Sequence, residues 1–471
     1  MPFARHPRPH TLTSLADVSP TPFWLDDPSR PAPAPALTAS TSADLVIVGA
    51  GFTGLWAALL AKEADASRDV VILEAGEAAS GASGRNGGFV DASLTHGFEN
   101  GLDRWPNEMR ALLALGHANL NAIESTVSRL GIDCDLLRSG ELTVATEPYQ
   151  LDEMRAEPEI AAAYGETIQW FEREETRALV NSPTYLGAVY DPSVIMVNPA
   201  RLACGLRKAC LDAGVRIYEN TSVAALERDK SLMVARTAHG QVRTRRVALA
   251  TNAFPPLLKR LSYYIVPVYD YALVTEPLSA AQRESIGWKN RQGVGDSGNL
   301  FHYYRTTADG RILWGGYDAI YHWNNGFGTQ FESDRESFGR LAEHFFETFP
   351  QLEGLRFTHA WGGAIDTSSR FSVFWGTAHR GRVAYALGYT GLGVGASRFG
   401  AQVMLDLLDG KENERTRLQM VRSKPMPFPP EPLRSAVVGW TQRDLDKADR
   451  NEGRRSLWLR LLDSLGLGFD S

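Results

Sequence analysis

The sequence predicts an α/β protein, in which a Rossmann-like domain is built from discontinuous segments and carries an inserted, mainly antiparallel β-sheet domain. A β-α-β pattern begins at residue 44, and a strand-helix alternation returns near 198 and again at 383–409. Between these pieces lie aromatic strands of alternating polarity, at 263–275 and 300–317. The 471 residues, 44% of them hydrophobic and 22% charged, are enough for two or three hydrophobic cores.

These patterns divide the chain into seven parts. We expect an extended arm at 1–40, segments of the Rossmann-like domain at 41–100, 196–260 and 356–410, a helical and β insertion at 101–195 that belongs largely to the substrate domain, the main substrate domain at 261–355, and a helical tail at 411–471. The arm is rich in Pro and Ala, a composition that cannot bury enough surface to order itself. We expect Phe23 and Trp24 to attach it to the body.

Bulk composition excludes several classes of protein. A net charge of −6 offers no basic field for nucleic acid. Cys134, Cys204 and Cys210 are too few and too scattered for a disulfide framework or a zinc site, so we expect reduced thiols, no metal and a cytoplasmic protein. The N-terminus has no apolar signal region, and three glycines interrupt the apolar run 45–61. We therefore expect no stable membrane insertion.

The first glycine motif lies between a buried strand at 44–48 and a helix at 55–64. Gly49 permits a tight turn, Gly51 lets the backbone approach a pyrophosphate, and Gly54 allows close packing of helix on strand. The next strand, 69–73, is followed by Glu74, where an acid accepts hydrogen bonds from a ribose. The pattern predicts a dinucleotide site with contacts from Gly49, Gly51, Phe52, Thr53, Gly54, Glu74 and Ala75.

A second glycine loop, SGASGRNGG at 80–88, follows almost at once. Such composition is typical of a flexible linker, which stays an alternative here. The loop, however, carries Arg85 and Asn86 only a few residues after the ribose acid. A second cradle at this place suits a longer dinucleotide, and it favours FAD over NAD.

In these motifs the chain resembles the FAD-dependent D-amino-acid oxidase superfamily, and within it the bacterial amine oxidoreductases similar to gamma-glutamylputrescine oxidase. The resemblance spans about 43–410. Beyond the two glycine loops it rests on ALATNAF (248–254), VPVYDYALVTEPL (266–278), YYRTTADGRILWGG (303–316), WGGAIDTSSR (361–370) and GYTGLGV (388–394).

The resemblance implies roles for further residues in holding the cofactor. It places the second glycine loop along the pyrophosphate and the flavin ring, Val223 at the adenine, and Thr251 at the end of a strand below the cofactor. The loop before the last helix lies at the anionic edge of the ring, where a helix N-terminus stabilises negative charge; the alternative is an ordinary β-α turn. The implied contacts are Ser83, Arg85, Asn86, Gly87, Gly88, Val223, Thr251, Asn252, Trp361, Gly388, Tyr389, Thr390, Gly391, Leu392, Gly393 and Val394.

We expect the FAD to be non-covalent. Relatives that attach flavin covalently use a Cys late in the chain or a His in the second glycine loop. This chain has no Cys after Cys210, and Arg85 stands in that loop.

The aromatic strands are the candidate roof of a substrate cleft, where aromatic rings cage an amine and exclude water. We expect Tyr269, His302, Arg305 and Trp361 to act there, with Tyr271, Tyr303 and Tyr304 beside them. Core packing is the alternative for each aromatic residue. Arg305 fits an anchor for a carboxylate or a structural role, and His96 and His302 fit bases or structural histidines.

The predicted function is oxidation of the C–N bond of a primary or secondary amine, either an amino acid or a polyamine derivative. A hydride passes to flavin N5, the imine hydrolyses to an aldehyde or keto product, and O2 or another acceptor reoxidises the flavin. Two alternatives stay open: an FAD-dependent 2-hydroxy-acid or polyol dehydrogenase, and a flavin-binding module without turnover. Oxidase or dehydrogenase, the substrate and the oligomeric state stay undecided.

The tail ends in RRSLWLRLLDSLGLGF. Trp458, Leu461, Leu462 and Leu465 recur at helical spacing, which predicts an amphipathic helix. We expect it to pack back on the body; a helix at a membrane surface or a partner is the alternative.

Overall fold

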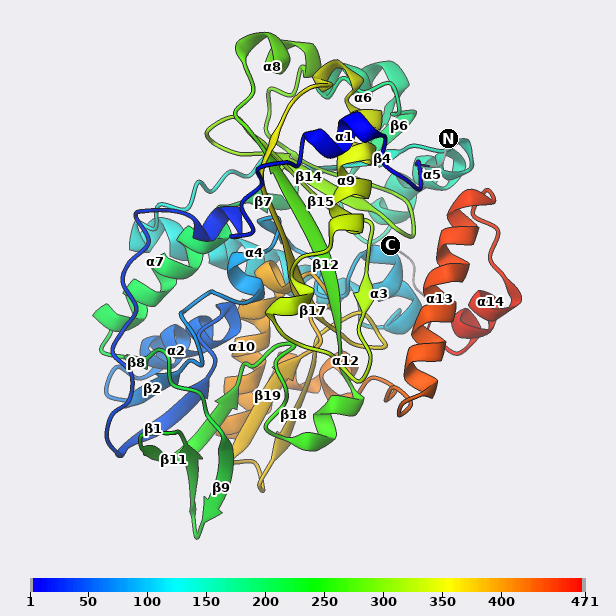
Figure 1. Cartoon of the computed structure of the whole chain (residues 1–471). Coiled ribbons are helices and arrows are strands. Elements are labelled where there is room, and N and C mark those ends of the chain that lie inside the picture. The colour runs from blue at the N-terminus through cyan, green and yellow to red at the C-terminus, as the bar shows by residue number, and fades with distance from the viewer. Residues whose placement is uncertain (1–2, 468–471) are drawn as a thin grey trace.

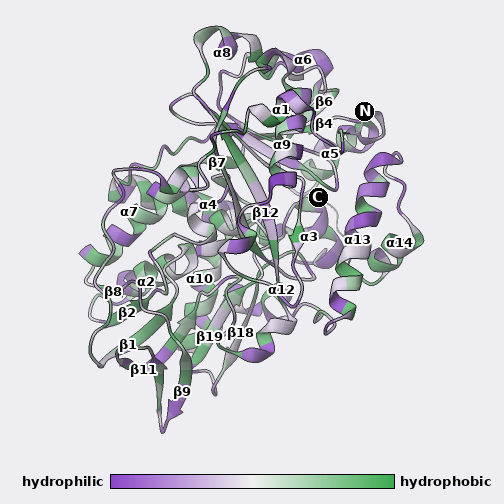
Figure 2. Cartoon of the chain, in the orientation of Figure 1, coloured by the Kyte–Doolittle hydropathy of each residue, from purple (hydrophilic) through white to green (hydrophobic). Residues whose placement is uncertain are grey.

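The computed structural model describes residues 3–467, and it places the strand β1 (Thr41–Val48) in the middle of a parallel sheet. The last four residues of β1 are buried because both faces of the sheet are covered. Leu45 and Ile47 face a core shared with helices, whereas Val46 and Val48 face a second core on the opposite side. Figure 2 shows the hydrophobic colouring of β1.

This first sheet has eight strands and contains the predicted β-α-β unit. Its central order is β18-β19-β11-β1-β2-β8, and the neighbours from β19 to β8 are parallel. The hairpin β9-β10 continues from β11. The strands are β1, β2 (Val70–Leu73), β8 (Arg216–Tyr218), β9 (Ala225–Asp229), β10 (Leu232–Arg236), β11 (Gln241–Leu249), β18 (Phe374–Ala378) and β19 (Val383–Leu387).

A layer of helices packs beside this sheet. The helix α2 (Phe52–Ala64) contacts α10 (Gly393–Asp409) and α7 (Pro199–Asp212). The long helix α4 (Met109–Leu130) lies against α10, where the Asn119 amide donates a hydrogen bond of 2.9 Å to the Gly395 carbonyl. The part of the insertion 101–195 that forms α4 therefore packs on the Rossmann-like domain.

The second sheet has nine strands and forms the upper half of the molecule in Figure 1. Every pairing in it is antiparallel except that of β13 with β4. The strands are β4 (Glu141–Ala145), β5 (Gln169–Glu172), β6 (Gly187–Asp191), β12 (Val266–Thr275), β13 (Gly293–Asp296), β14 (His302–Thr306), β15 (Ile312–Gly316), β16 (Ile320–Tyr321) and β17 (Phe357–Thr367). The α/β class with a mainly antiparallel inserted sheet is confirmed.

One predicted boundary is wrong. The range 356–410 was assigned to the Rossmann-like domain, but β17 pairs with β12 from Phe357 to Thr367 in the antiparallel sheet. The chain crosses to the parallel sheet only after this strand, because β18 is the next strand and pairs with β19.

Smaller elements complete the body. The helix α9 (Arg335–Thr348) packs on β12 and β15. The strand β3, directly after the second glycine loop, pairs antiparallel with β7, which precedes α7. These elements are β3 (Phe89–Asp91), α3 (Phe98–Arg104), α5 (Leu151–Ala162), α6 (Arg173–Leu179), β7 (Val194–Met196), α8 (Ala280–Ile286) and α9.

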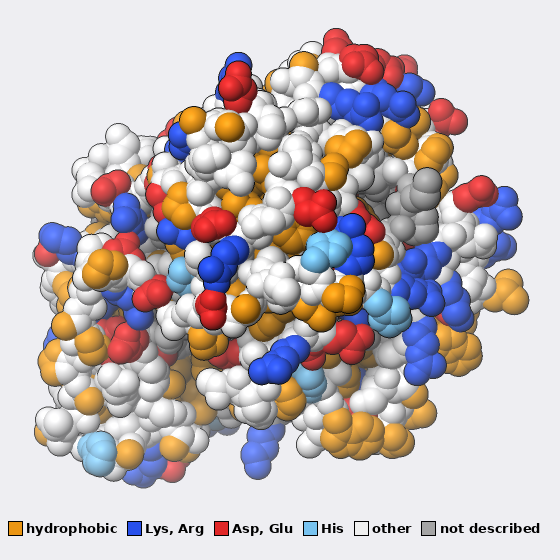
Figure 3. All heavy atoms as spheres, turned by 45° about the horizontal axis from the view of Figure 1, so that its top comes forward, with side chains coloured by type: hydrophobic (Ala, Val, Ile, Leu, Met, Phe, Trp, Pro, Cys, Tyr) orange, Lys and Arg blue, Asp and Glu red, His pale blue; other side chains and the backbone are white. Residues whose placement is uncertain are grey.

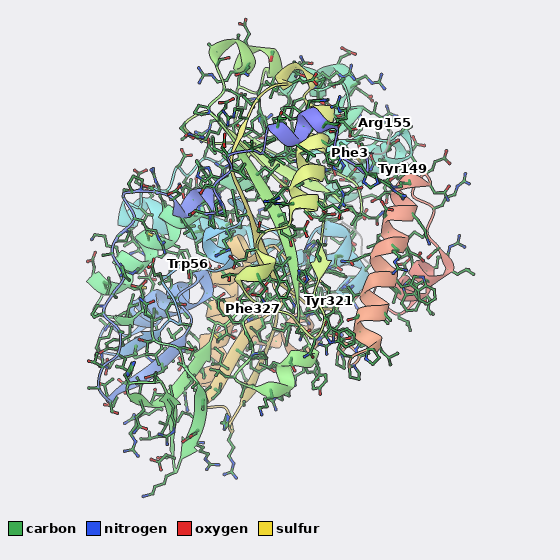
Figure 4. The ribbon with its side chains drawn as sticks, in the orientation of Figure 1. Phe3, Trp56, Tyr149, Arg155, Tyr321 and Phe327 are labelled. Carbon is green, nitrogen blue, oxygen red and sulfur yellow. The ribbon has the colours of Figure 1, made fainter. Side chains whose placement is uncertain are left out.

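The N-terminal arm crosses the surface of both halves, as the dark blue trace in Figure 1 shows. Its short helix α1 (Pro9–Thr13) packs on α9, and the Phe3 ring lies 4.7 Å from the ring of His344 (Figure 4). Trp24 is only 4% exposed and donates a hydrogen bond of 2.8 Å to the Asn86 carbonyl. The arm is therefore fixed to the second glycine loop.

The tail forms a helical hairpin at the right of Figure 1. After α11 (Glu414–Arg417) and α12 (Gln419–Arg422), the helices α13 (Leu433–Arg450) and α14 (Leu457–Ser464) pack together. The predicted inward face of α14 needs a correction: Leu459 is buried, whereas Leu461 and Leu465 are exposed. No helix within residues 3–467 is long and apolar enough to cross a lipid bilayer.

Candidate cofactor and substrate site

A cavity of about 830 Å³ lies between the two sheets. The carboxyl ends of the parallel strands, all three glycine loops and the tail hairpin contribute to its wall, in the place where open α/β sheets bind ligands. It is lined by twenty of the residues predicted to hold a cofactor: Gly49, Gly51, Phe52, Thr53, Glu74, Ala75, Ser83, Arg85, Asn86, Gly87, Val223, Thr251, Asn252, Trp361, Tyr389, Thr390, Gly391, Leu392, Gly393 and Val394. Gly54, Gly88 and Gly388 lie behind the wall.

The first glycine loop turns β1 directly into α2. Gly49 has a φ of +106°, which favours glycine, and a Cβ there would overlap the Ala250 carbonyl. A Cβ on Gly54 would overlap the Gly49 carbonyl, so this glycine sets how closely the helix approaches the strand. The N-terminus of α2 therefore lies open to the cavity, where its positive end suits a phosphate.

Glu74 follows β2 and lines the cavity. Its carboxylate accepts hydrogen bonds from the backbone N–H groups of Ala50 at 2.6 Å and Gly76 at 2.9 Å. Burial raises its pKa. Each carboxylate oxygen has a second lone pair, so Glu74 retains capacity for a ribose hydroxyl.

The second glycine loop is rigidly built. Ser83 Oγ accepts a hydrogen bond of 2.9 Å from the backbone N–H of Phe52, which joins the first two loops. Asn86 donates to the carbonyl groups of Ala82 and Ser83 and accepts from the backbone N–H of Gly88. These hydrogen bonds fix the conformation of the second glycine loop, as would not be expected of a flexible linker.

Arg85 joins this loop to the antiparallel sheet. Its guanidinium donates to the carbonyl oxygens of Ser80, at 2.8 Å, and Gly362, at 3.1 Å, and lies 2.7 Å from the Glu332 carboxylate. Trp361 Nε1 donates a hydrogen bond of 3.0 Å to the Arg85 carbonyl. The loop is therefore attached to β17 through both its backbone and its side chain.

The third glycine loop, 388–394, is organised by a buried acid that the sequence did not reveal. Asp366, at the end of β17, accepts hydrogen bonds from the backbone N–H groups of Gly388 at 2.6 Å and Tyr389 at 3.2 Å. Burial raises the pKa of Asp366 to about 7. Gly391 has a φ of +94°, and a Cβ added to it would have nothing within 4 Å. This part of the loop is therefore open.

These features fit a flavin dinucleotide. Three separate glycine loops present backbone to one elongated cavity, and an added Cβ at Gly51 would lie 2.9 Å from Ser83 Oγ, between the first two loops. The residues that would hold FAD are the α2 N-terminus, Glu74, the second loop and the third loop. FAD supplies the redox chemistry that no side chain provides.

Three of the four residues predicted to act on the substrate do not line the cavity, which corrects that expectation. Tyr269 is buried, and its hydroxyl donates to the Gly328 carbonyl at 3.3 Å. Arg305 is 1% exposed and donates to the carbonyl oxygens of Gly88 and Val197, so it supports the second glycine loop from behind. Burial without a partner carboxylate lowers its pKa to about 9.

His302 is fully buried in a hydrogen-bonded chain. Its Nδ1 lies 2.7 Å from Asp296 Oδ2, its Nε2 lies 2.9 Å from His344 Nδ1, and His344 Nε2 lies 2.7 Å from the Ala4 carbonyl. Because that carbonyl only accepts, His344 donates to it through Nε2–H and accepts from His302 Nε2–H. His302 thus connects the antiparallel sheet with the N-terminal arm.

Strand geometry explains which aromatic residues reach the cavity. Successive side chains of β14 point to opposite faces, so Tyr303 lines the cavity while Tyr304 is buried in the core. Tyr271 and Trp361 also line it, and so does His96. Burial lowers the pKa of His96.

Carboxylates on the antiparallel sheet and on β3 contribute to the site although they were not among the predicted site residues. Asp91, Glu141 and Asp270 line the cavity. Burial raises the pKa of Glu141 to about 8, with a further contribution from Asp91, and raises those of Asp91 and Asp270 to about 6. Charged residues inside otherwise apolar strands, as in ELTVA and YDYAL, were the available signal.

The tail supplies a second unexpected part of the wall. Val437, Val438 and Leu445 of α13 and Leu459 and Leu462 of α14 line the cavity. The tail is attached at its base by the Tyr321 hydroxyl, which donates to Glu431 at 2.7 Å (Figure 4), and further along by Asp449, which accepts from Asn299.

Comparison with curated proteins gives relatives over most of the chain. Gamma-glutamylputrescine oxidoreductase of Escherichia coli is 32% identical over 405 residues, which covers 82% of this chain and 88% of that protein. The probable oxidoreductase OrdL of Haemophilus influenzae is 28% identical over 406 residues, 83% of this chain and 88% of that protein.

Solved structures share the fold. The crystal structure of glycine oxidase from Geobacillus kaustophilus superposes with a TM-score of 0.67 at 22% identity, covering 79% of this chain and 96% of that one. The FAD dependent oxidoreductase family model matches residues 44–407, which include all three glycine loops and both sheets except the first three residues of β1. The chain therefore belongs to the FAD dependent oxidoreductase family and is an FAD-dependent flavoenzyme.

Proposed function

We propose that this enzyme oxidises the C–N bond of a primary or secondary amine, giving an imine that hydrolyses to an aldehyde or keto product. When bound, FAD accepts the hydride from the carbon next to nitrogen. The names of two relatives, gamma-glutamylputrescine oxidoreductase and glycine oxidase, point to the same class of substrate.

The charge of the cavity wall is the observation that carries this proposal. Among the described residues, the lining holds seven carboxyl side chains and two arginines, with no lysine: Glu74, Glu77, Asp91, Glu141, Asp270, Asp318 and Asp366 against Arg85 and Arg455. Both arginines are already paired, Arg85 with Glu332 and Arg455 with Asp463, at 2.7 Å each. Among the acids, Glu77 is likewise paired with Arg30 and Asp318 with Arg340. Such a wall favours a cationic ammonium and disfavours the anion of a 2-hydroxy acid.

Glu141 and Asp91 are the chain's own groups for receiving an ammonium. The raised pKa of Glu141 reflects burial and repulsion from Asp91, whereas that of Asp91 reflects burial and repulsion from Asp191. A cation placed beside these acids relieves both effects. A carboxylate whose pKa lies near neutrality is also suited to accept a proton from the ammonium, which leaves the neutral amine that hydride loss requires. Tyr271, Tyr303 and Trp361 cover the cavity with aromatic surface that excludes water.

In the test, the purified FAD enzyme is mixed without oxygen with a panel of amines, amino acids and 2-hydroxy acids. The absorbance of the flavin band is measured after each addition. Amines are expected to bleach the band, and 2-hydroxy acids are not. Admission of air then separates the two acceptor classes: fast recolouring with peroxide identifies an oxidase, and slow recolouring a dehydrogenase. Bleaching by 2-hydroxy acids alone contradicts the proposal.

A variant sharpens the test. Glu141→Gln is expected to raise KM for the amine about tenfold with little change in bound FAD, because one buried charge facing the cation is lost. Glu159→Gln, which removes a carboxylate from an exposed position on α5, is the matched control and leaves KM unchanged.

A further inference from the structure

The outer face of the tail hairpin exposes an unusual amount of apolar surface. Twelve large hydrophobic side chains are exposed among the described residues, and six of them lie between 426 and 465. Scattered single residues of this kind are ordinary on any protein surface, but a local concentration is typical of an interaction site. The six are Met426, which precedes α13 and also lines the cavity, and Leu433, Trp440, Leu457, Leu461 and Leu465.

On α14 these side chains form one stripe. Leu457 is 84% exposed, Leu461 49% and Leu465 55%. Their spacing of four residues places Leu457 and Leu461 on one side of α14, with Leu465 directly after its last residue. Trp458 borders the stripe, and its ring stacks on that of Trp440 from α13 with centroids 5.3 Å apart. We refer to Trp440, Leu457, Trp458, Leu461 and Leu465 as the outer patch.

The charges around the outer patch are basic, although the chain as a whole carries a net charge of −6. Among charged side chains of Leu433–Ser464, the exposed ones are Arg443, Lys447, Arg454 and Arg460 against Glu452. Of these, Lys447 is paired with Asp444 at 3.1 Å and Arg454 with Glu452 at 3.0 Å. The partly buried acids Asp446 and Asp463 are ion-paired with Arg450 and Arg455. Figure 3 shows basic and hydrophobic side chains together along the right-hand edge, over the tail.

The outer patch is held in place rather than loosely attached. Leu445, Ala448 and Leu459 form a small core inside the hairpin, and Ser456 caps α14 while donating a hydrogen bond of 2.6 Å to Asp444. Asp449 joins the hairpin to the loop between β13 and β14 of the antiparallel sheet, because its carboxylate accepts hydrogen bonds from the backbone N–H groups of Asn299 and Leu300. The leucine stripe is therefore exposed in the folded protein.

We propose that the outer patch is a peripheral docking surface for an anionic lipid membrane. A short helix that combines leucine and tryptophan on one face with flanking arginines is suited to lie in the headgroup region. Exposed basic side chains add attraction to anionic lipids. Docking needs no membrane-spanning helix, and it is independent of which substrate the enzyme oxidises.

The position of the patch gives the docking a consequence for the cavity. Leu459 and Leu462 of α14 line the cavity, while Leu457 and Leu461 of the same helix, with Leu465 just after it, form the outer stripe. Only the thickness of one helix, about 10 Å, therefore separates the docked surface from the cavity. Docking places the cavity next to the lipid phase.

The experiment is sedimentation of the full-length, FAD-loaded enzyme with vesicles. Binding is expected with vesicles of phosphatidylcholine and phosphatidylglycerol, with a fall as salt is raised, and only weakly with pure phosphatidylcholine. The variant Leu457→Glu/Leu461→Glu is expected to lose binding about tenfold or more. Arg454→Glu/Arg460→Glu is expected to lose a similar amount on the anionic vesicles alone.

The matched control is Ile160→Glu/Leu211→Glu, which places two glutamates at exposed apolar positions elsewhere and retains binding. Unchanged FAD content and melting temperature show that each variant is folded. Absence of binding to anionic vesicles overturns the proposal, as does equal binding by wild type and the patch variant. A concentration-dependent increase in mass that the patch variant abolishes, without vesicle binding, assigns the patch to self-association instead.

Discussion

The hydroxyl of Thr53 donates a hydrogen bond of 3.0 Å to the hydroxyl oxygen of Tyr389, and this contact joins two glycine loops that lie 336 residues apart in the chain. Both side chains are buried. The bond fixes the start of α2 relative to the loop that precedes α10, so the two ends of the dinucleotide cradle keep a constant separation.

Replacing Tyr389 with Phe tests this link. The buried Thr53 hydroxyl loses its acceptor, and we expect the free energy of unfolding to fall by about 1 kcal/mol. FAD affinity is expected to fall severalfold, measured by titration of the apoprotein. Tyr263→Phe changes an exposed tyrosine and is expected to alter neither quantity; equal effects of the two variants contradict the assignment.

Gly54→Ala tests the close approach of α2 to β1. The added Cβ overlaps the Gly49 carbonyl, so the helix start must move and the phosphate-facing backbone moves with it. We expect destabilisation of about 1–3 kcal/mol and FAD binding at least about tenfold weaker. Gly439→Ala, in α13 with nothing within 4 Å of the new methyl group, is the control and retains FAD.

The cofactor loops were predictable because each is a local motif: glycines at fixed spacing between a strand and a helix require no knowledge of distant contacts. The acidic wall was not. Glu141 and Asp270 lie on separate strands of one sheet, and their common cavity follows from strand order and register, which a single sequence does not specify.

The predicted substrate roof was wrong in part, for a related reason: Tyr271, Tyr303 and Trp361 line the cavity, whereas His302, Tyr304 and Arg305 do not. His302, Tyr303 and Tyr304 are consecutive in β14, so alternation sends them to opposite faces, and only Tyr303 reaches the cavity. Arg305 shares the face of Tyr303, but the arm covers it: its guanidinium lies 5.8 Å from the Trp24 ring centre. An arm that covers a strand from outside is invisible in local patterns.

The corrected role of His302 gives a prediction. His302→Gln breaks the connection from Asp296 to His344, and we expect the free energy of unfolding to fall by about 2 kcal/mol or more because buried partners are left unpaired. Turnover per bound FAD is expected to stay near the wild-type value. A large loss of that turnover in a folded, FAD-loaded variant returns His302 to the catalytic residues.

Glu141 predicts a pH dependence of stability in the apoprotein. Its ordinary pKa is 4.5 and its pKa in the folded protein is about 8, so between these values the folded state holds a proton that the unfolded state has lost. Stability from this group is fully present below pH 4.5 and is lost as pH rises through about 8. Glu141→Gln is therefore expected to be more stable than wild type above that range, by roughly 1–3 kcal/mol, and to differ little at acid pH. Thermal unfolding across pH measures this, and a difference of opposite sign contradicts the shifted pKa.

The way FAD is held gives the last prediction. Cys134 and Cys210 are buried, burial raises the pKa of each thiol to about 12, and neither they nor Cys204 lines the cavity. Thiolate formation is thus suppressed at neutral pH, and none of these sulfurs can reach a bound ring. In the second glycine loop Arg85 is fully engaged with Ser80, Gly362 and Glu332.

Precipitating the yellow enzyme with acid is therefore expected to release the flavin into the supernatant. The triple variant Cys134→Ser/Cys204→Ser/Cys210→Ser, purified with the same flavin content, is the control. Flavin that stays in the wild-type pellet after denaturation and washing shows a covalent bond, and His96, the histidine among the residues that line the cavity, becomes the side chain to replace next.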